Sequence, residues 1–168
     1  TSKLAATGGT ATLLGSIGFD SWYAMAVNAS AVFVGRGNGV VNGYPIAGGS
    51  GTTVAPPLEG GGYLAVDATT VYVGREYSKI FTAPAAGGGT VTELWGSLVT
   101  KTPFAADATH LFALSPGTGQ VNAVKRAKSG GTVAQLGQVP SAAANGKYMV
   151  AVDATHMWVA VWKPSPRS

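Results

Sequence analysis

The chain has 168 residues, enough for one domain with its own core, and its 46% apolar content excludes generic disorder. It contains no Cys, which excludes disulfides, thiolate metal ligands and a Cys nucleophile. Charged residues make up only 11%, the net charge of +4 reflects a shortage of acids, and no apolar run approaches the length of a membrane span.

The first predicted elements are two strands at the N-terminus, residues 1–6 and 10–14, separated by a Gly8-Gly9 turn. Glycine supplies the positive φ that tight hairpin turns need. The chain begins with neither Met nor a signal peptide, so we expect a processed or excised piece.

A segment with an Asn or Asp turn occurs four times along the chain. Each copy has an apolar run, the turn residue, and a second run of β-branched or aromatic residues. The turn residues are Asn28, Asp67, Asp107 and Asp153, so the successive spacings are 39, 40 and 46 residues. Gly-Gly pairs followed by Thr recur between these segments. Two markers with one period predict four repeats of roughly 42 residues.

Each repeat predicts four short strands, as the second repeat illustrates. Apolar runs at 63–66 and 71–73 flank Asp67, and two alternating segments, 79–83 and 90–95, flank a run of three glycines. No stretch carries the 3.6-residue period of a helix. The sequence therefore predicts an all-β fold in which each repeat is a four-stranded antiparallel sheet, as in the blade of a β-propeller.

The last predicted strand, residues 157–162, is the second strand of its repeat, so the fourth repeat lacks its outer half. The N-terminal strands match the third and fourth strands of a repeat and would supply that half. We therefore expect one β-propeller domain over residues 1–168, with its last blade completed by the N-terminal strands. Two alternatives fit the same ends: a fragment of a longer propeller, and two copies that associate into a larger ring.

The run Ala65-Val66-Asp67-Ala68-Thr69, followed by Val71-Tyr72 and a Gly-Gly-Thr marker, resembles the blade repeats of six- and seven-bladed bacterial propellers of the YWTD and NHL-like group. The resemblance covers essentially the whole chain and implies a β-propeller fold. At the YWTD positions this sequence has Tyr72-Val73-Gly74-Arg75, so only the aromatic residue is kept. The receptor-type ligand role of that group is therefore not carried over.

The four turn residues are predicted to cap their turns, because Asp and Asn side chains bond nearby backbone N–H groups. Asn28 occupies the same position and cannot act as a general base, so a ring of catalytic acids is not favoured. His110 and His156 share one repeat position, and two His fall short of the three protein ligands of a typical zinc site. We expect no catalytic residue, no metal and no cofactor.

Just before their first strands the repeats differ from one another. These segments carry aromatic and basic residues, namely Trp22, Tyr23, Tyr63, Lys101, Lys147 and Tyr148. In a propeller such positions lie near one mouth of the central channel, where they either fill the centre of the ring or bind a ligand. They are the candidate ligand-binding residues.

Three functions remain open. The first is a non-catalytic binding or scaffold module of a secreted, periplasmic or cell-surface bacterial protein, with a protein or glycan bound at the channel mouth. The second is a carbohydrate-binding propeller, and the third is a metal-dependent lyase or hydrolase. The bases are dispersed, with their densest cluster at Lys125, Arg126 and Lys128, so neither a nucleic-acid partner nor a membrane span is predicted.

Overall fold

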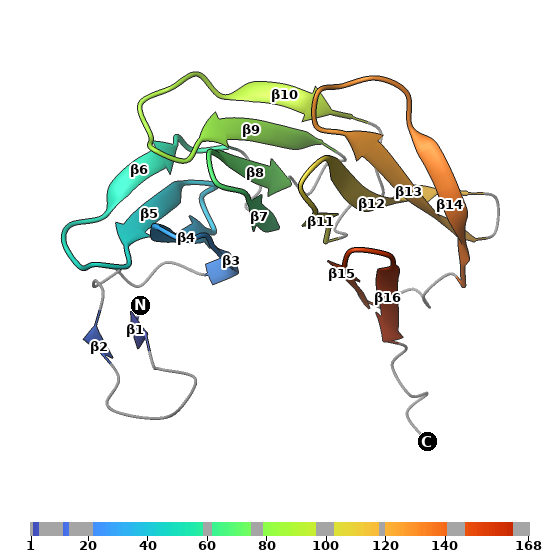
Figure 1. Ribbon diagram of the computed structural model, residues 1–168, viewed down its shortest axis with the longest axis horizontal. Helices are drawn as coiled ribbons and strands as arrows, with labels where there is room; N and C mark the ends of the chain where they lie inside the picture. The colour runs from blue at the N-terminus through green and yellow to red at the C-terminus, as the bar shows by residue number, and fades with distance from the viewer. Residues whose placement is uncertain are drawn as a thin grey trace.

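The computed structural model describes residues 2–3, 12–13, 22–58, 62–74, 79–96, 103–117, 120–140 and 147–162. Figure 1 shows that these residues form a succession of small sheets. Every helix or strand assigned in this part of the chain is a strand, which confirms the all-β prediction. Within it there is accordingly no helix long and apolar enough to span a membrane.

Three antiparallel sheets have four strands each, and the strands of each sheet lie in sequence order. The first sheet consists of β3 (Trp22–Val27), β4 (Ala31–Arg36), β5 (Val41–Pro45) and β6 (Thr52–Ala55). The second consists of β7 (Leu64–Val66), β8 (Thr70–Gly74), β9 (Ile80–Pro84) and β10 (Thr92–Trp95). The third consists of β11 (Ala105–Ala106), β12 (His110–Pro116), β13 (Val121–Ala127) and β14 (Ala134–Val139).

The turns of these sheets form where the sequence supplies suitable residues. The first and second strands of each sheet are joined at the Asn or Asp position. The third and fourth strands are joined through Gly48, Gly87 and Gly130, whose φ values are 95°, 79° and 95°. Residues with a Cβ rarely adopt this backbone conformation, so the repeated glycines set where each outer hairpin turns.

Among the described residues, two further sheets have two strands each, β1 (Ser2–Lys3) with β2 (Thr12–Leu13), and β15 (Lys147–Val152) with β16 (Met157–Trp162). The latter pair matches the first and second strands of the fourth repeat. The strands β1–β2 and β15–β16 each pair only within their own sheet, and β1–β2 lies on the side of the first sheet, at the opposite end of the molecule from β16 (Figure 1). Completion of the last sheet by the N-terminal strands therefore stays a prediction. In the part of the chain that the structure describes, the fourth sheet is thus a half sheet.

The sheets follow one another along an open arc, with β3, β7, β11 and β15 on its inner side (Figure 1). Contacts between β3 and β7, between β7 and β11, and between β11 and β15 keep these first strands adjacent. The two ends of the arc do not meet. The described residues therefore form the predicted succession of antiparallel sheets, and their arrangement as a propeller stays a prediction.

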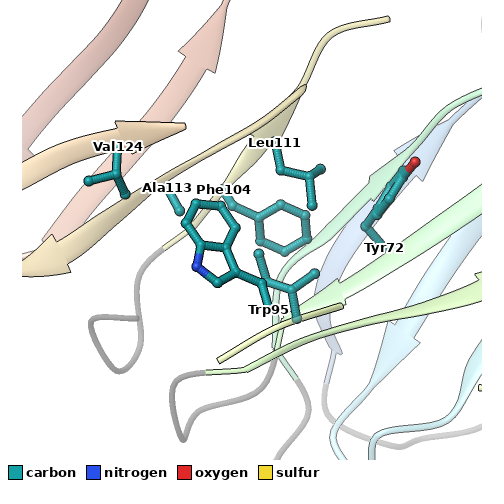
Figure 2. Close-up of a cluster of buried hydrophobic side chains, with 7 residues drawn as sticks. Tyr72, Trp95, Phe104, Leu111, Ala113 and Val124 are labelled. Atoms are coloured by element: carbon teal, nitrogen blue, oxygen red, sulfur yellow. The ribbon is translucent and has the colours of Figure 1, made fainter. Parts of the chain in front are cut away.

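The core lies between adjacent sheets, because each sheet presents apolar side chains on both faces. Between the first two sheets Phe33 packs in one cluster with Val71. Between the second and third, Trp95 packs with Phe104 and Leu111, and Figure 2 shows these side chains converging. Sheets buried on both faces leave little surface for charge, which accounts for the 11% of charged residues.

Candidate functional site

The four repeat turns share one hydrogen-bond pattern. Asp67 Oδ1 accepts from the backbone N–H of Thr69 at 3.0 Å and from that of Thr70 at 2.9 Å. The side-chain oxygens of Asn28, Asp107 and Asp153 accept the two equivalent bonds at 2.6–3.0 Å. Because the Asn28 amide does the same as the carboxylates, the turn requires an oxygen acceptor and not a negative charge.

These bonds stabilise the ionised form of the carboxyl groups. Burial raises the pKa of Asp67, but bonds from Lys128, Tyr72 and the turn N–H groups outweigh it and hold that pKa below its usual range. At Asp107 the turn bonds likewise outweigh burial and lower the pKa, and at exposed Asp153 the turn N–H groups are the first cause of a lowered pKa. Their stabilising contribution is therefore present above about pH 4 and is lost as the pH falls.

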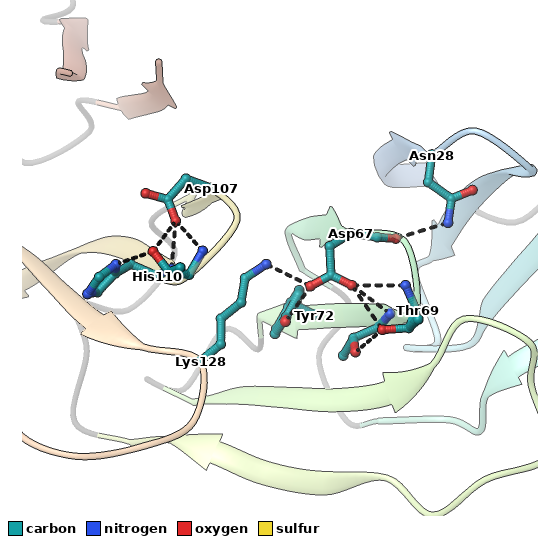
Figure 3. A network of polar contacts seen from close by, with 9 residues as sticks. Asn28, Asp67, Thr69, Tyr72, Asp107, His110 and Lys128 are labelled. Carbon is teal, nitrogen blue, oxygen red and sulfur yellow. Dashed lines mark hydrogen bonds and ion pairs between the residues drawn. The ribbon is translucent and has the colours of Figure 1, made fainter. Parts of the chain in front are cut away.

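Asp67 also joins three successive sheets, as Figure 3 shows. Its Oδ2 accepts from Tyr72 Oη at 2.8 Å and from Lys128 Nζ, which follows β13 in the third sheet, at 2.6 Å. The ammonium group lies 5.0 Å from the centre of the Tyr72 ring. From the first sheet, Asn28 Nδ2 donates to the backbone oxygen of Asp67 at 3.0 Å. This polar group therefore holds neighbouring sheets together.

The two histidines bond within their own turns. His110 Nδ1 lies 2.7 Å from Thr109 Oγ1, and His156 Nδ1 lies 2.6 Å from Thr155 Oγ1. Over the described ranges, no three His, Asp or Glu side chains form a group that would hold a metal ion. The repeated His position therefore belongs to the turn structure in both repeats where it occurs.

Two of the predicted ligand-binding residues pack between sheets. Tyr63 precedes β7 and lies against the cluster that contains Trp95 and Phe104. Tyr148, on β15, lies against the cluster that contains Leu114. Both side chains are half-buried, so each contributes to packing and keeps part of its surface accessible.

Of the other four predicted residues, three lie on first strands, which face the inner side of the arc. Trp22 and Tyr23 lie on β3, where the pairing with β4 shifts register between Trp22 and Ala24. Lys147 is the exposed first residue of β15, and Lys101 lies outside the described residues. The structure therefore distributes the candidate ligand residues that it describes over the starts of successive sheets.

Exposed apolar side chains, which we did not single out from the sequence, gather at the two ends of the arc. Within the described part of the chain, the exposed large hydrophobic residues are Met25, Val27, Val133, Leu136, Met149, Trp158 and Trp162. The first two lie on β3, and the others lie on or beside β14, β15 and β16. A sequence signal for this does exist, since residues 157–162 are apolar at every position.

Replacing Asp107 with Ala should lower the free energy of unfolding by about 1–2 kcal/mol, because two turn N–H groups lose their acceptor. The Asp107→Asn variant should cost much less, since Asn28 forms the same two bonds in the first repeat. Urea unfolding at pH 7 measures both. Equal losses in the two variants would show that the turn depends on the charge of Asp107.

No protein-family model and no curated protein matches the chain. Among solved structures, the chain is similar to the crystal structure of the computationally designed Ika4 protein. The TM-score is 0.59 and the sequence identity 13%, over 92% of this chain and 96% of that chain. At this identity the likeness concerns the fold alone, and it extends over nearly the full length of both chains.

Proposed function

We propose that the chain is a non-catalytic binding or scaffold module of β-propeller type, in which each four-stranded sheet is one blade. Three complete sheets with one strand order support this arrangement. So do their face-to-face packing and the position of their first strands on the inner side of the arc. We place such a module in a secreted, periplasmic or cell-surface protein of a bacterium.

The non-catalytic assignment rests on one observation, namely that the repeated carboxylates are engaged in hydrogen bonds of the fold. Asp67, Asp107 and Asp153 each bind two backbone N–H groups of their own turn. The remaining oxygens of Asp67 and Asp153 accept from side chains, that of Asp153 from Trp158 Nε1 at 2.9 Å. A general acid needs a proton to donate near neutral pH, and lowered pKa values do not favour that role.

We place ligand binding at the starts of the first strands. Packing between sheets holds these strands in place, while the residues at or just before their first positions differ from repeat to repeat. In repeat proteins, recognition surfaces typically consist of residues that vary between repeats whose packed backbone stays the same. Lys101 and Lys147 suit an acidic group, and Trp22, Tyr23 and Tyr148 are residue types that contact flat apolar groups. An acidic peptide segment with aromatic residues, from a partner protein, matches this chemistry.

An array of immobilised peptides probed with the labelled chain tests this function. We expect binding to acidic peptides with aromatic residues, and we expect Lys147→Ala to weaken it about tenfold by removing one charge-assisted contact. The matched control is Lys79→Ala, which removes an exposed lysine that pairs with Glu93 Oε2 at 2.6 Å and should leave binding unchanged.

Three outcomes would contradict the proposal. Equal binding by the Lys147→Ala variant and the unmodified chain would place the ligand elsewhere. Binding confined to a glycan array would favour the carbohydrate-binding alternative. Turnover of a glycan or ester in the presence of added divalent metal would favour a lyase or hydrolase.

A further inference from the structure

We call the face of a sheet that packs on the next sheet along the chain its leading face. On the last sheet this face is uncovered. Phe33 and Tyr72 occupy equivalent positions on the leading faces of the first two sheets, and they are only 1% and 3% exposed. Trp158 occupies this position in the fourth repeat and is 59% exposed. Met149 and Trp162, also in this half sheet, are 71% and 56% exposed.

The trailing face, which packs on the preceding sheet, is partly uncovered on the first sheet. Leu64, Phe104 and Val150 occupy one equivalent position, and each packs in a cluster with the sheet before it. Met25 holds this position in the first repeat and is 69% exposed, and Val27 is 62% exposed. We call the interface between two adjacent sheets a joint. The two ends of the arc thus present the two kinds of apolar surface, one leading and one trailing, that meet at each joint within the chain.

The strand pair β1–β2 has the register of an outer hairpin. Its partners are Lys3 with Thr12 and Ser2 with Leu13. In β5–β6 the partners are residues 43 with 52 and 42 with 53, each 40 positions later. The chain therefore carries an outer hairpin at one end of the arc and an inner hairpin, β15–β16, at the other.

A groove of about 420 Å³ lies beside β16, where no outer strand of the fourth sheet is found among the described residues. It is lined by residues of β13–β14, among them Ala123, Leu136 and Val139, and by Met157 and Val159 of β16. In the first two sheets the corresponding strands β6 and β9 are in contact. The groove and the exposed Leu136 are therefore the surface that an outer hairpin of the next sheet would cover.

We propose that two copies of this chain close into one ring. In each copy the strands β1–β2 of the partner complete the last sheet in the groove, and the leading face at Trp158 packs on the trailing face at the partner's Met25. A head-to-tail interface that closes after two copies forms two identical joints, and these joints cover both ends of both arcs. The inference does not depend on the ligand proposed above.

Light scattering coupled to size-exclusion chromatography tests the association directly. At micromolar concentration the unmodified chain should elute as a single species with twice the mass of the 16.8 kDa chain. A species of one chain mass would overturn the proposal and would favour closure by the chain's own hairpin. A series of larger species would also overturn it, because the joint would then propagate without closing.

Single charges at the two faces test the joint. Met25→Asp and Trp158→Asp should each raise the dissociation constant of the dimer by about tenfold to a hundredfold, since an apolar contact would bury an unpaired charge. Ala86→Asp, which adds the same charge at an exposed residue of the second sheet, should leave it unchanged. Loss of the dimer in only one of the two variants would indicate contact between like faces and would contradict the head-to-tail joint.

A cysteine pair tests the proposed strand pairing. In the first two sheets the third strand pairs with the second, residue 42 with 34 and residue 81 with 73. Ser2 is equivalent to residues 42 and 81, and Val159 is equivalent to residues 34 and 73. Ser2 of one copy should therefore lie opposite Val159 of the other. The chain has no native Cys, so mild oxidation of the Ser2→Cys/Val159→Cys variant should give covalent dimers that reduction removes. Each single-Cys variant serves as a control and should stay uncrosslinked. A disulfide formed within one chain would show that the partner's hairpin is not the one in the groove.

Discussion

Replacement of Gly39 with Ala should destabilise the chain by about 3 kcal/mol or more, among the larger effects of single substitutions. Gly39 has a φ of +81°, and a Cβ built on it would overlap the backbone carbonyl of Leu58. The loop has no simple way to move aside, because the Gly39 N–H donates to Arg36 O at 2.9 Å and the Leu58 N–H donates to Gly39 O at 3.4 Å. Chemical unfolding in urea measures the loss.

Gly48→Ala is the matched control for this substitution. Gly48 has a φ of +95°, and nothing lies within 4 Å of a Cβ built on it. Only the strain of the left-handed backbone remains, which costs about 1–2 kcal/mol. A similar loss in the two variants would show that backbone strain, and not the approach of Leu58, makes glycine necessary at position 39.

Truncation of Trp95 to Ala should cost about 3–5 kcal/mol, the usual range for a large aromatic residue removed from a core. Trp95 is 3% exposed and packs in the cluster that joins the second sheet to the third (Figure 2). The vacated volume lies between two sheets that other contacts hold in place, so it collapses only in part. Urea unfolding of the variant measures this contribution.

The neighbouring Glu93 provides the control on the same strand. It is exposed and pairs with Lys79, so Glu93→Ala should cost at most about 1 kcal/mol. Trp95→Phe should fall between the two, because it keeps an aromatic ring in the cluster. If Trp95→Ala were no worse than Glu93→Ala, the joint between these sheets would contribute little to stability.

Local features of the fold were predictable because turn chemistry and alternation depend on neighbouring residues. The strand predicted at residues 157–162 coincides with β16 (Met157–Trp162). The turn positions at Asn28 and Asp67 lie between strands, with their side chains bonded to backbone N–H groups two and three residues later. Each of these interactions joins residues that are close in sequence, so the pattern of neighbouring residues is enough to predict it.

Contacts between sheets were not predictable in the same way. The sequence shows Lys128 only as a member of a basic cluster, yet its side chain is only 13% exposed and binds Asp67, 61 residues earlier. Its neighbour Arg126 donates to the backbone oxygen of Leu94 at 2.7 Å. Repeat spacing establishes which residues are equivalent but does not establish which of them meet across a joint. For the same reason the sequence could not show whether the arc closes.

The joints between sheets match large residues with small ones. A Cβ added to Gly74 would lie 2.8 Å from the Phe104 ring, and one added to Gly35 would lie 3.4 Å from Leu64. The third repeat has Leu114 at the position of these glycines, and there it packs in one cluster with the smaller Val150.

Because of this size matching, the order of the repeats along the chain determines whether adjacent sheets fit together. Exchanging the second and third repeats would bring Leu114 against Leu64, and that joint would be overfilled. It would also leave Gly74 facing Val150, and that joint would be underfilled. Recombination between the repeats of such a gene would therefore yield chains with mismatched joints, even though every strand and turn in them remained intact.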